Sequence, residues 1–376
     1  MQQSFEVIII GRGITGLSTA WHLKGLGFRN VCIVSPPRTQ FNSASLNAGY
    51  ASVSLHDNIT RAAHGLGSNT ASELLGLNRV GFQELTEFAR LFDVDCRIGQ
   101  VFRVSGSQHE DEEMAVAVDW LRLNGFPASM EKSEGYAIQK DGAAAASLDI
   151  VTLLNRLETA VDCATLDSTV QNLDSKSDHI VVELQSGQKL RAEVVVLACH
   201  TGIKSIIPTL SSSFVNHADQ WMEFDMIKKN DILSPGNLIF SGHSQFWISP
   251  TYRGTLAAGG CRYLRKWAGV EAEDAPVMDE VIIAVKEKIE SQFSIKLSKQ
   301  ISAQGIIDIR TCDEIPVIGP MYGDSRILLA SGYMGTGLTF GFAAGKGLSD
   351  FIHSGSSKII PRVFHPSRLR SLPEID

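Results

Sequence analysis

Long apolar runs and paired cysteines are the features that the sequence most plainly lacks. No stretch of the 376 residues approaches the ~20 consecutive apolar residues that a membrane-spanning helix needs. The six cysteines are scattered, with no C-x-x-C pair and no metal-ligand spacing, which indicates free thiols rather than a disulfide framework or a metal site. The first residues lack the positive charge and the apolar length of a signal peptide. We therefore expect a cytoplasmic protein with no bound metal and no membrane partner.

An excess of basic charge is also missing. With 34 Lys and Arg against 41 Asp and Glu, the formal net charge is −7 at pH 7. No overall attraction to nucleic acid is expected at that charge. Hydrophobic residues make up 44% and charged residues 20% of the chain, as in ordinary globular proteins. The length favours two joined domains over one core.

What is present at the N-terminus is a strand, a glycine-rich turn, a helix and a second strand within residues 5–35. The turn has Gly11, Gly13 and Gly16 at the G-x-G-x-x-G positions, and residues 31–34 are a buried second strand. The first glycine permits the tight turn, the second lets backbone approach a pyrophosphate, and the third lets the helix pack closely on the strand. Because a helix N-terminus offers unpaired N–H groups to phosphates, the pattern predicts a dinucleotide site.

The second strand departs from this fingerprint at its end. An Asp or Glu is expected there to hold the ribose hydroxyls of the nucleotide, but the chain has Ser35 followed by two prolines. A serine hydroxyl can bond a ribose, but a charge-assisted hydrogen bond is about twice as strong. The sequence therefore predicts weaker retention of the nucleotide rather than a different ligand.

A second glycine-rich turn lies near the other end of the chain. A buried strand at 327–330 leads into Gly332, Gly335 and Gly337, after which a helix is predicted from about 338 to 352. A turn followed by a helix N-terminus is an anion-binding device like the first. Between the two turns, the pattern predicts helices at 150–161 and 279–293 and a strand at 180–184. Residues 211–300 alternate as in an antiparallel sheet, which the helix 279–293 covers.

These two ends resemble the D-amino-acid-oxidase-like (DAO) family of flavoproteins, which includes glycine oxidase and sarcosine oxidase. The loop at 43–49 and the strand at 194–199 share the resemblance. The strongest match is 311–320, which is similar to the family's T-x-D-x-x-P-x-x-G strand, leading into 332–339. The resemblance implies an α/β fold, with a Rossmann-like FAD-binding domain of the glutathione-reductase type and an interleaved antiparallel-sheet α+β substrate domain. The implied FAD-binding segments are 1–90, 145–210 and 300–376, and the implied substrate segments are 91–144 and 211–299.

The resemblance implies FAD as the cofactor. Noncovalent binding is expected, because Ile306 stands where the sarcosine oxidases have their anchoring cysteine. Negative charge builds at N1 and the C2 carbonyl of a reduced isoalloxazine, and backbone N–H groups of 337–339 would stabilise it as an oxyanion hole does. Val170 would contact adenine through its backbone, and the 43–49 loop would lie along the flavin. The implied cofactor-binding residues are Gly11, Gly13, Ile14, Thr15, Gly16, Ser35, Ser43, Ser45, Asn47, Ala48, Gly49, Val170, Cys199, Gly332, Gly335, Thr336, Gly337, Leu338 and Thr339.

The family's chemistry is hydride transfer to flavin N5 from a carbon next to an amine nitrogen, which gives an imine that water hydrolyses. This reaction depends on positioning more than on acid–base groups of the protein. Trp247 stands where related enzymes place an aromatic ring over the substrate. The resemblance thus implies an oxidase or dehydrogenase with a small amine or amino acid as substrate and oxygen or another carrier as electron acceptor.

Asp308 is a second departure from the family pattern. Amino-acid-oxidising relatives usually have an arginine at this position, five residues before the aspartate of the T-x-D motif, where it clamps the substrate carboxylate. An aspartate would repel a carboxylate and pair with an ammonium group, which favours a diamine, a polyamine or an amine without the usual carboxylate. Alternatively, Asp308 points away and Arg310, on the same face of the strand, is the clamp.

Two other functions share this layout. A related flavoenzyme modifies tRNA by oxidising a carboxymethylaminomethyl uridine, but the acidic balance and the lack of a basic, aromatic-laced patch argue against that function. A non-catalytic subunit would keep the fold for assembly, with Ser35 marking decayed cofactor binding. We expect the catalytic flavoenzyme, acting on a small molecule and without a nucleic-acid partner.

Overall fold

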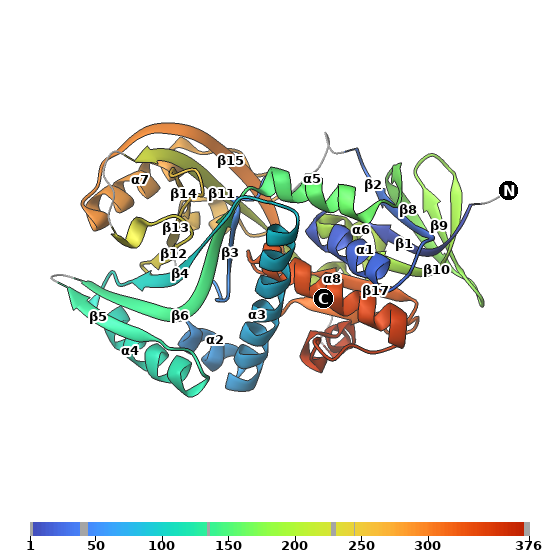
Figure 1. Ribbon diagram of the computed structural model, residues 1–376, viewed down its shortest axis with the longest axis horizontal. Coiled ribbons are helices and arrows are strands. Elements are labelled where there is room, and N and C mark those ends of the chain that lie inside the picture. Colours follow the sequence, from blue (N-terminus) through green and yellow to red (C-terminus); the bar gives the residue numbers. More distant parts are fainter. Residues whose placement is uncertain (1–2, 38–43, 134–135, 227–230, 244, 372–376) are drawn as a thin grey trace. The chain divides into compact units, whose positions relative to one another are not determined.

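Two compact units make up the structure. The computed structural model describes residues 3–37, 44–133, 136–226, 231–243 and 245–371 (Figure 1). The first unit comprises Met1–Ser45, Leu154–Asn216 and Asp308–Asp376, and the second comprises Leu46–Leu153 and His217–Ile307. None of the helices in the described ranges combines the length and the apolar character that crossing a membrane requires.

The first unit is built on an eight-stranded sheet. Six strands follow one another in the order β16-β17-β10-β1-β2-β7, and β9 extends the sheet from β10 and carries β8. The pairs of β1 with β2 and β10, of β2 with β7 and of β10 with β17 are parallel, so their carboxyl ends share one edge. The strands are β1 (Ser4–Ile10), β2 (Val31–Ser35), β7 (Ala164–Asp167), β8 (Val170–Ser175), β9 (Ile180–Leu184), β10 (Lys189–Leu197), β16 (Val317–Pro320) and β17 (Ile327–Ser331).

Helices α1 (Ile14–Gly25) and α8 (Gly337–Ser354) lie side by side in this unit, as Figure 1 shows. Their contact is close because glycines of α8 face α1. A Cβ added at Gly341 would lie 2.8 Å from Ile14 Cγ2, and one at Gly345 would lie 2.3 Å from Ser18 Oγ. These contacts pair the first two turns of α1 with the second and third turns of α8. The N-termini of α1 and α8 are therefore neighbours, although they are some three hundred residues apart in the chain. The unit also contains the short α6 (Ile203–Ile206) and most of α5 (Ile150–Val161).

The second unit is built on a nine-stranded sheet. Eight strands follow one another in the order β15-β11-β14-β13-β12-β4-β6-β3, and β5 pairs with β6. These strands are β3 (Tyr50–Ser52), β4 (Cys96–Val104), β5 (Ser129–Ser133), β6 (Tyr136–Leu148), β11 (Phe214–Met226), β12 (Leu238–Ser241), β13 (Phe246–Pro250), β14 (Leu256–Gly260) and β15 (Leu297–Thr311). The helices are α2 (Ile59–Leu66), α3 (Ser68–Leu91), α4 (Gln108–Leu123) and α7 (Asp279–Phe293).

Helix α7 covers one face of this sheet. Met222 and Ile248 belong to a buried cluster with Val281 and Val285 of the helix. Because neighbouring residues of a strand point to opposite faces, Glu223 and Trp247 belong to the other face. The predicted antiparallel sheet with a covering helix is confirmed. The face opposite α7 carries Glu223 and Trp247.

The division into units differs from the predicted domain boundaries. Residues 46–90, which we assigned to the cofactor domain, lie in the second unit. The physical reason is pairing: Tyr50 and Ala51 of β3 pair with Ser147 and Ala146 of β6 in the nine-stranded sheet. Which unit binds cofactor and which binds substrate stays a prediction.

Candidate functional site

The first glycine-rich turn is shaped by two close backbone approaches. Gly11 has a left-handed φ of 116°, and a Cβ there would lie 2.2 Å from the carbonyl oxygen of Ala198, at the end of β10. A Cβ at Gly16 would lie 2.0 Å from the carbonyl oxygen of Gly11. Both contacts involve backbone, which cannot move aside as a side chain can. Protein packing alone therefore requires glycine at these two positions.

Gly13 is different, because packing does not require it. Its φ is −88°, which any residue adopts, and the nearest described heavy atom to an added Cβ is Ala44 Cβ at 4.0 Å. Neither the backbone conformation nor the described neighbours require glycine here. Close approach of a bound ligand would require it. The middle position of G-x-G-x-x-G is where a pyrophosphate approaches backbone. The geometry of Gly13 fits a dinucleotide such as FAD.

The second glycine-rich turn packs on the T-x-D strand. Gly332 has a φ of 78°, and a Cβ there would lie 2.8 Å from Cγ2 of Thr311. Gly335 also has a left-handed φ, 81°. Thr336 is the N-cap of α8, and its hydroxyl donates to the carbonyl oxygen of Tyr333 at 2.7 Å. Leu338 and Thr339 are buried in the first turn of the helix.

A hydrogen bond joins the two turns. Thr15 Oγ1 lies 2.9 Å from the hydroxyl of Tyr333. Burial raises the pKa of Tyr333 well above its usual range, partly offset by the bond to Thr15, so the phenol stays protonated at neutral pH. Sequence patterns at opposite ends of the chain thus form one continuous region of the first unit, with the N-termini of α1 and α8 beside each other.

Both helix N-termini have the features of an anion site. Gly13 has no side chain to cap α1, the Thr336 hydroxyl makes no capping bond to α8, and neither first turn contains an acidic residue. Ser107 shows the contrast, since its hydroxyl accepts from the backbone N–H of Glu110 at the start of α4. The first N–H groups of a helix have no partner within the helix, and its dipole favours negative charge there. The arrangement fits a ligand with a pyrophosphate and a second electron-rich group.

Three other predicted cofactor residues lie at or just beyond the ends of strands of the first sheet. Ser35 ends β2, and its hydroxyl donates to the carbonyl oxygen of Pro36 at 3.2 Å. Cys199 follows β10, and burial raises the pKa of its thiol to about 12, so it remains a neutral thiol. Val170 begins β8 and is 6% exposed.

The remaining predicted cofactor residues fall in the loop before β3. Ser45 ends the first segment of the first unit, whereas Asn47, Ala48 and Gly49 belong to the second unit. Asn47 Oδ1 accepts from the backbone N–H of Gly49 at 2.8 Å, and Gly49 has a φ of 76°. Ser43 lies outside the described residues.

Asp308 and Arg310 form an ion pair near the end of β15. Arg310 Nε lies 3.4 Å from Asp308 Oδ2, and the side chains are 10% and 19% exposed. Within the described ranges, neither of these two atoms makes a hydrogen bond of good geometry. The two predicted substrate residues are therefore neighbours. A ligand that binds Asp308 must compete with Arg310 for its carboxylate.

His200 is within the electrostatic influence of Asp308, which the sequence did not predict. Burial lowers the pKa of His200, while the negative charge of Asp308 acts in the opposite direction. The residue follows Cys199 directly and has a left-handed φ of 52°, an uncommon conformation for a residue other than glycine. The sequence could have indicated His200 as a site residue, because it follows a central parallel strand and ligands bind at the carboxyl ends of such strands.

Trp247 is buried on the second sheet. Its ring centroid lies 4.6 Å from that of Tyr50, and it is 8% exposed. A Cβ at Gly259, on the neighbouring strand, would lie 2.7 Å from the indole. Glycine is thus required beneath the ring, which is clamped between strand and tyrosine on the face opposite α7.

The T-x-D aspartate has a structural role. Asp313 pairs with Arg368 of the C-terminal segment at 2.7 Å and accepts from the backbone N–H of Ile315. Burial opposes ionisation of Asp313, but the hydrogen bond and charge of Arg368 outweigh it and hold the pKa of this carboxyl below its usual value. This motif fixes the turn before β16 rather than offering a reactive group.

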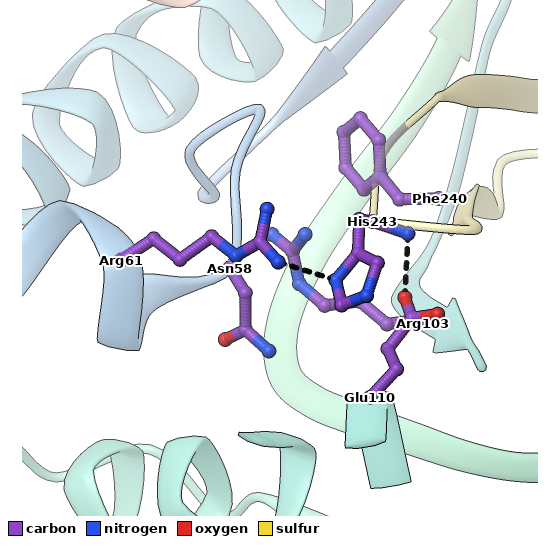
Figure 2. A pocket seen from close by; sticks show the side chains of 6 residues that line it. All are labelled: Asn58, Arg61, Arg103, Glu110, Phe240 and His243. Carbon is purple, nitrogen blue, oxygen red and sulfur yellow. Dashed lines mark hydrogen bonds between the residues drawn. The ribbon is translucent and has the colours of Figure 1, made fainter. Parts of the chain in front are cut away.

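A polar pocket also lies within the second unit (Figure 2). Arg61 Nη2 lies 2.6 Å from His243 Nδ1, and the backbone N–H of His243 donates to Glu110 at 2.7 Å. Arg61 is paired with Glu113 at 2.8 Å. The charges are thus neutralised among themselves, tying α2 and α4 to the turn after β12. The lining residues are Asn58, Arg61, Arg103, Glu110, Phe240 and His243.

Metal-ligand clusters were not expected from the sequence. Across the described ranges no group of three or more His, Cys, Asp or Glu side chains is arranged to hold a metal ion.

The parallel sheet and paired turns define a dinucleotide-binding α/β protein, and the chain belongs to the family of FAD dependent oxidoreductases, the DAO family, whose model matches residues 6–351. Glycine oxidase from Geobacillus kaustophilus is similar in structure, with 15% identity, 97% of this chain and 99% of that chain covered, and a TM-score of 0.76. L-proline dehydrogenase from P. horikoshii has 13% identity, with 98% of this chain and 99% of that chain covered, and a TM-score of 0.76. L-amino acid deaminase from Proteus vulgaris has 16% identity, with 98% of this chain and 94% of that chain covered, and a TM-score of 0.74. No curated protein matches the chain.

The comparisons confirm the predicted family and fold class. At these identities the solved structures establish the fold, and the family model establishes an FAD-dependent oxidoreductase.

Proposed function

We propose that this FAD-dependent oxidoreductase oxidises the CH–NH bond of an amine or amino acid. The observation that carries the proposal is the junction of the two glycine-rich turns through Thr15 and Tyr333, with the N-termini of α1 and α8 beside each other. FAD bound there would supply the hydride acceptor for the substrate carbon, and water would hydrolyse the imine that the substrate becomes. Oxygen or another carrier takes the electrons afterwards.

Residues of the first unit supply binding and charge stabilisation in this proposal. Backbone N–H groups at the start of α1 bind the pyrophosphate, with Gly13 allowing its approach. Backbone N–H groups of Gly337, Leu338 and Thr339 would stabilise negative charge on the ring of a bound flavin. Ile306 takes the place of an anchoring cysteine, so the cofactor is held noncovalently.

We propose that Asp308 selects the substrate through an ammonium group. Its carboxylate is largely buried and makes no well-formed hydrogen bond through Oδ2 within the described ranges. A second ammonium group of a diamine or polyamine would complete its bonding, in competition with Arg310. Trp247, whose ring packs against that of Tyr50, stays the aromatic residue proposed to contact the substrate.

The test is a panel of amino acids, N-methyl amino acids and diamines, added without oxygen while flavin absorbance is followed. Asp308→Asn keeps the shape of the side chain and removes its charge. We expect the apparent Kd for a diamine to rise by about tenfold or more, since a hydrogen bond to a charged group contributes about 1.5–3 kcal/mol. The Kd of a monoamine should change little.

Arg310→Gln is the matched variant, because it removes the other charge of the same ion pair. If Arg310 is the clamp, this variant loses carboxylate-bearing substrates while Asp308→Asn gains affinity for them. Bleaching by carboxylate-bearing substrates alone, unaffected by Asp308→Asn, would exclude an ammonium anchor. Bleaching by no member of the panel would argue against amine oxidation itself.

A further inference from the structure

The end of β7 carries a carboxylate beside the position where the fingerprint lacks one. Ser35 is the last residue of β2 and Asp167 is the last residue of β7, and the two are register partners in parallel strands. The backbone N–H of Ser168 donates to the carbonyl oxygen of Ser35 at 2.9 Å, which fixes the two strand ends together. Register partners point to the same face of a sheet, so Asp167 and Ser35 present their side chains on one side.

Arg12 connects this carboxylate to the first glycine-rich turn. It lies between Gly11 and Gly13, and its Nη2 is 3.1 Å from Asp167 Oδ1. Its Nε is 3.5 Å from Glu158 of α5. The Arg12 side chain is 15% exposed and that of Asp167 59% exposed, so the arginine is held while the carboxylate faces solvent. The ion pair orients Asp167 toward the turn without enclosing it.

We propose that Asp167 takes the place of the missing β2 carboxylate and binds the ribose hydroxyls of the adenosine half of FAD. This inference rests on the proposed FAD site. A carboxylate accepts bonds from both hydroxyls of a ribose, whereas the Ser35 hydroxyl bonds the backbone of Pro36. In this proposal the carboxylate that accepts the ribose hydrogen bonds stands at the end of β7 instead of the end of β2, and the small side chain of Ser35 lies beside it.

The charges of the cluster select for a ribose without a 2′-phosphate. Asp167 and Glu158 carry two negative charges against the one positive charge of Arg12. A phosphate at the 2′ position would meet a net negative group, although an arginine near this strand end otherwise accommodates such a phosphate. We therefore expect ADP to bind better than its 2′-phosphorylated form.

The experiment measures binding rather than turnover. Apoprotein freed of flavin is titrated with FAD, with ADP as a competitor that carries the adenosine half alone. Asp167→Asn should weaken both FAD and ADP by about tenfold, and Ser35→Glu in the same chain should restore most of the loss. The melting temperature of the apoprotein should change little, because the Asp167 side chain is 59% exposed and Arg12 keeps Glu158 as an ionic partner.

Asp178→Asn is the matched control. Asp178 is also an exposed aspartate paired with an arginine in the first unit, 2.7 Å from Arg191, but it lies between β8 and β9. This variant should bind FAD and ADP as the unmodified chain does. Equal affinities of Asp167→Asn and the unmodified chain would overturn the inference, as would a loss of FAD affinity without a loss of ADP affinity. If the unmodified chain binds ADP but not FAD, the proposed function fails, and the ADP titration still decides the role of Asp167.

Discussion

Replacement of Gly16 by alanine is expected to destabilise the first unit by about 3 kcal/mol, the upper end of the cost of overpacking. The added Cβ would lie 2.0 Å from the carbonyl oxygen of Gly11 and 3.2 Å from Cγ2 of Ile9. The backbone at Gly11 and the start of α1 would have to move apart, which separates α1 from β1. Urea unfolding of the apoprotein, followed by circular dichroism, measures this change.

Gly25→Ala is the matched control for this prediction. Gly25 ends the same helix, and no described heavy atom lies within 4 Å of its added Cβ. We expect this variant to be as stable as the unmodified chain or slightly more stable, because alanine loses less conformational entropy than glycine on folding. Equal stability of the two variants would show that α1 does not approach β1 as closely as described.

Replacement of Gly13 by alanine is expected to leave folding intact and to weaken FAD binding by about tenfold to a hundredfold. The φ of −88° suits alanine, and the added methyl group meets no described atom closer than 4.0 Å. The methyl group would instead displace the pyrophosphate from the helix N–H groups, and each charge-assisted bond contributes about 1.5–3 kcal/mol. FAD titration and the melting temperature of the same apoprotein separate the two effects.

The contrast between Gly13 and Gly16 distinguishes a ligand contact from a packing contact. A Gly13→Ala chain that binds FAD with the unmodified affinity would mean that no pyrophosphate approaches this residue. A Gly13→Ala chain that fails to fold would place a protein segment where we propose the ligand.

Elements with a strong local pattern were predicted closely from the sequence. The helices 150–161 and 279–293 and the strand 180–184 begin and end as expected. Their apolar periodicity is unambiguous and does not depend on distant partners. Strand β6 was missed because its core is the run 143–146 of four alanines, which have low strand propensity. Its pairing with β4 and β3, which determines its conformation, is not visible in the local sequence.

The site shows the same division between local and distant information. Glycine spacing located both turns, and the strand ends located Ser35 and Cys199. The interactions that complete the site join residues far apart in the chain, such as the ion pair of Arg12 with Asp167 and the electrostatic effect of Asp308 on His200. No periodicity reports such contacts, because they follow from strand order and register.

The central claim is that the two glycine-rich turns hold FAD noncovalently for oxidation of an amine. One measurement tests it most directly: the purified chain is saturated with FAD, freed of excess by gel filtration and mixed with the amine panel in the absence of oxygen. It is then precipitated with acid. The account predicts stoichiometric flavin, bleaching by at least one amine, and intact FAD in the supernatant. A chain that leaves the column colourless, or flavin that stays with the precipitate, would contradict it.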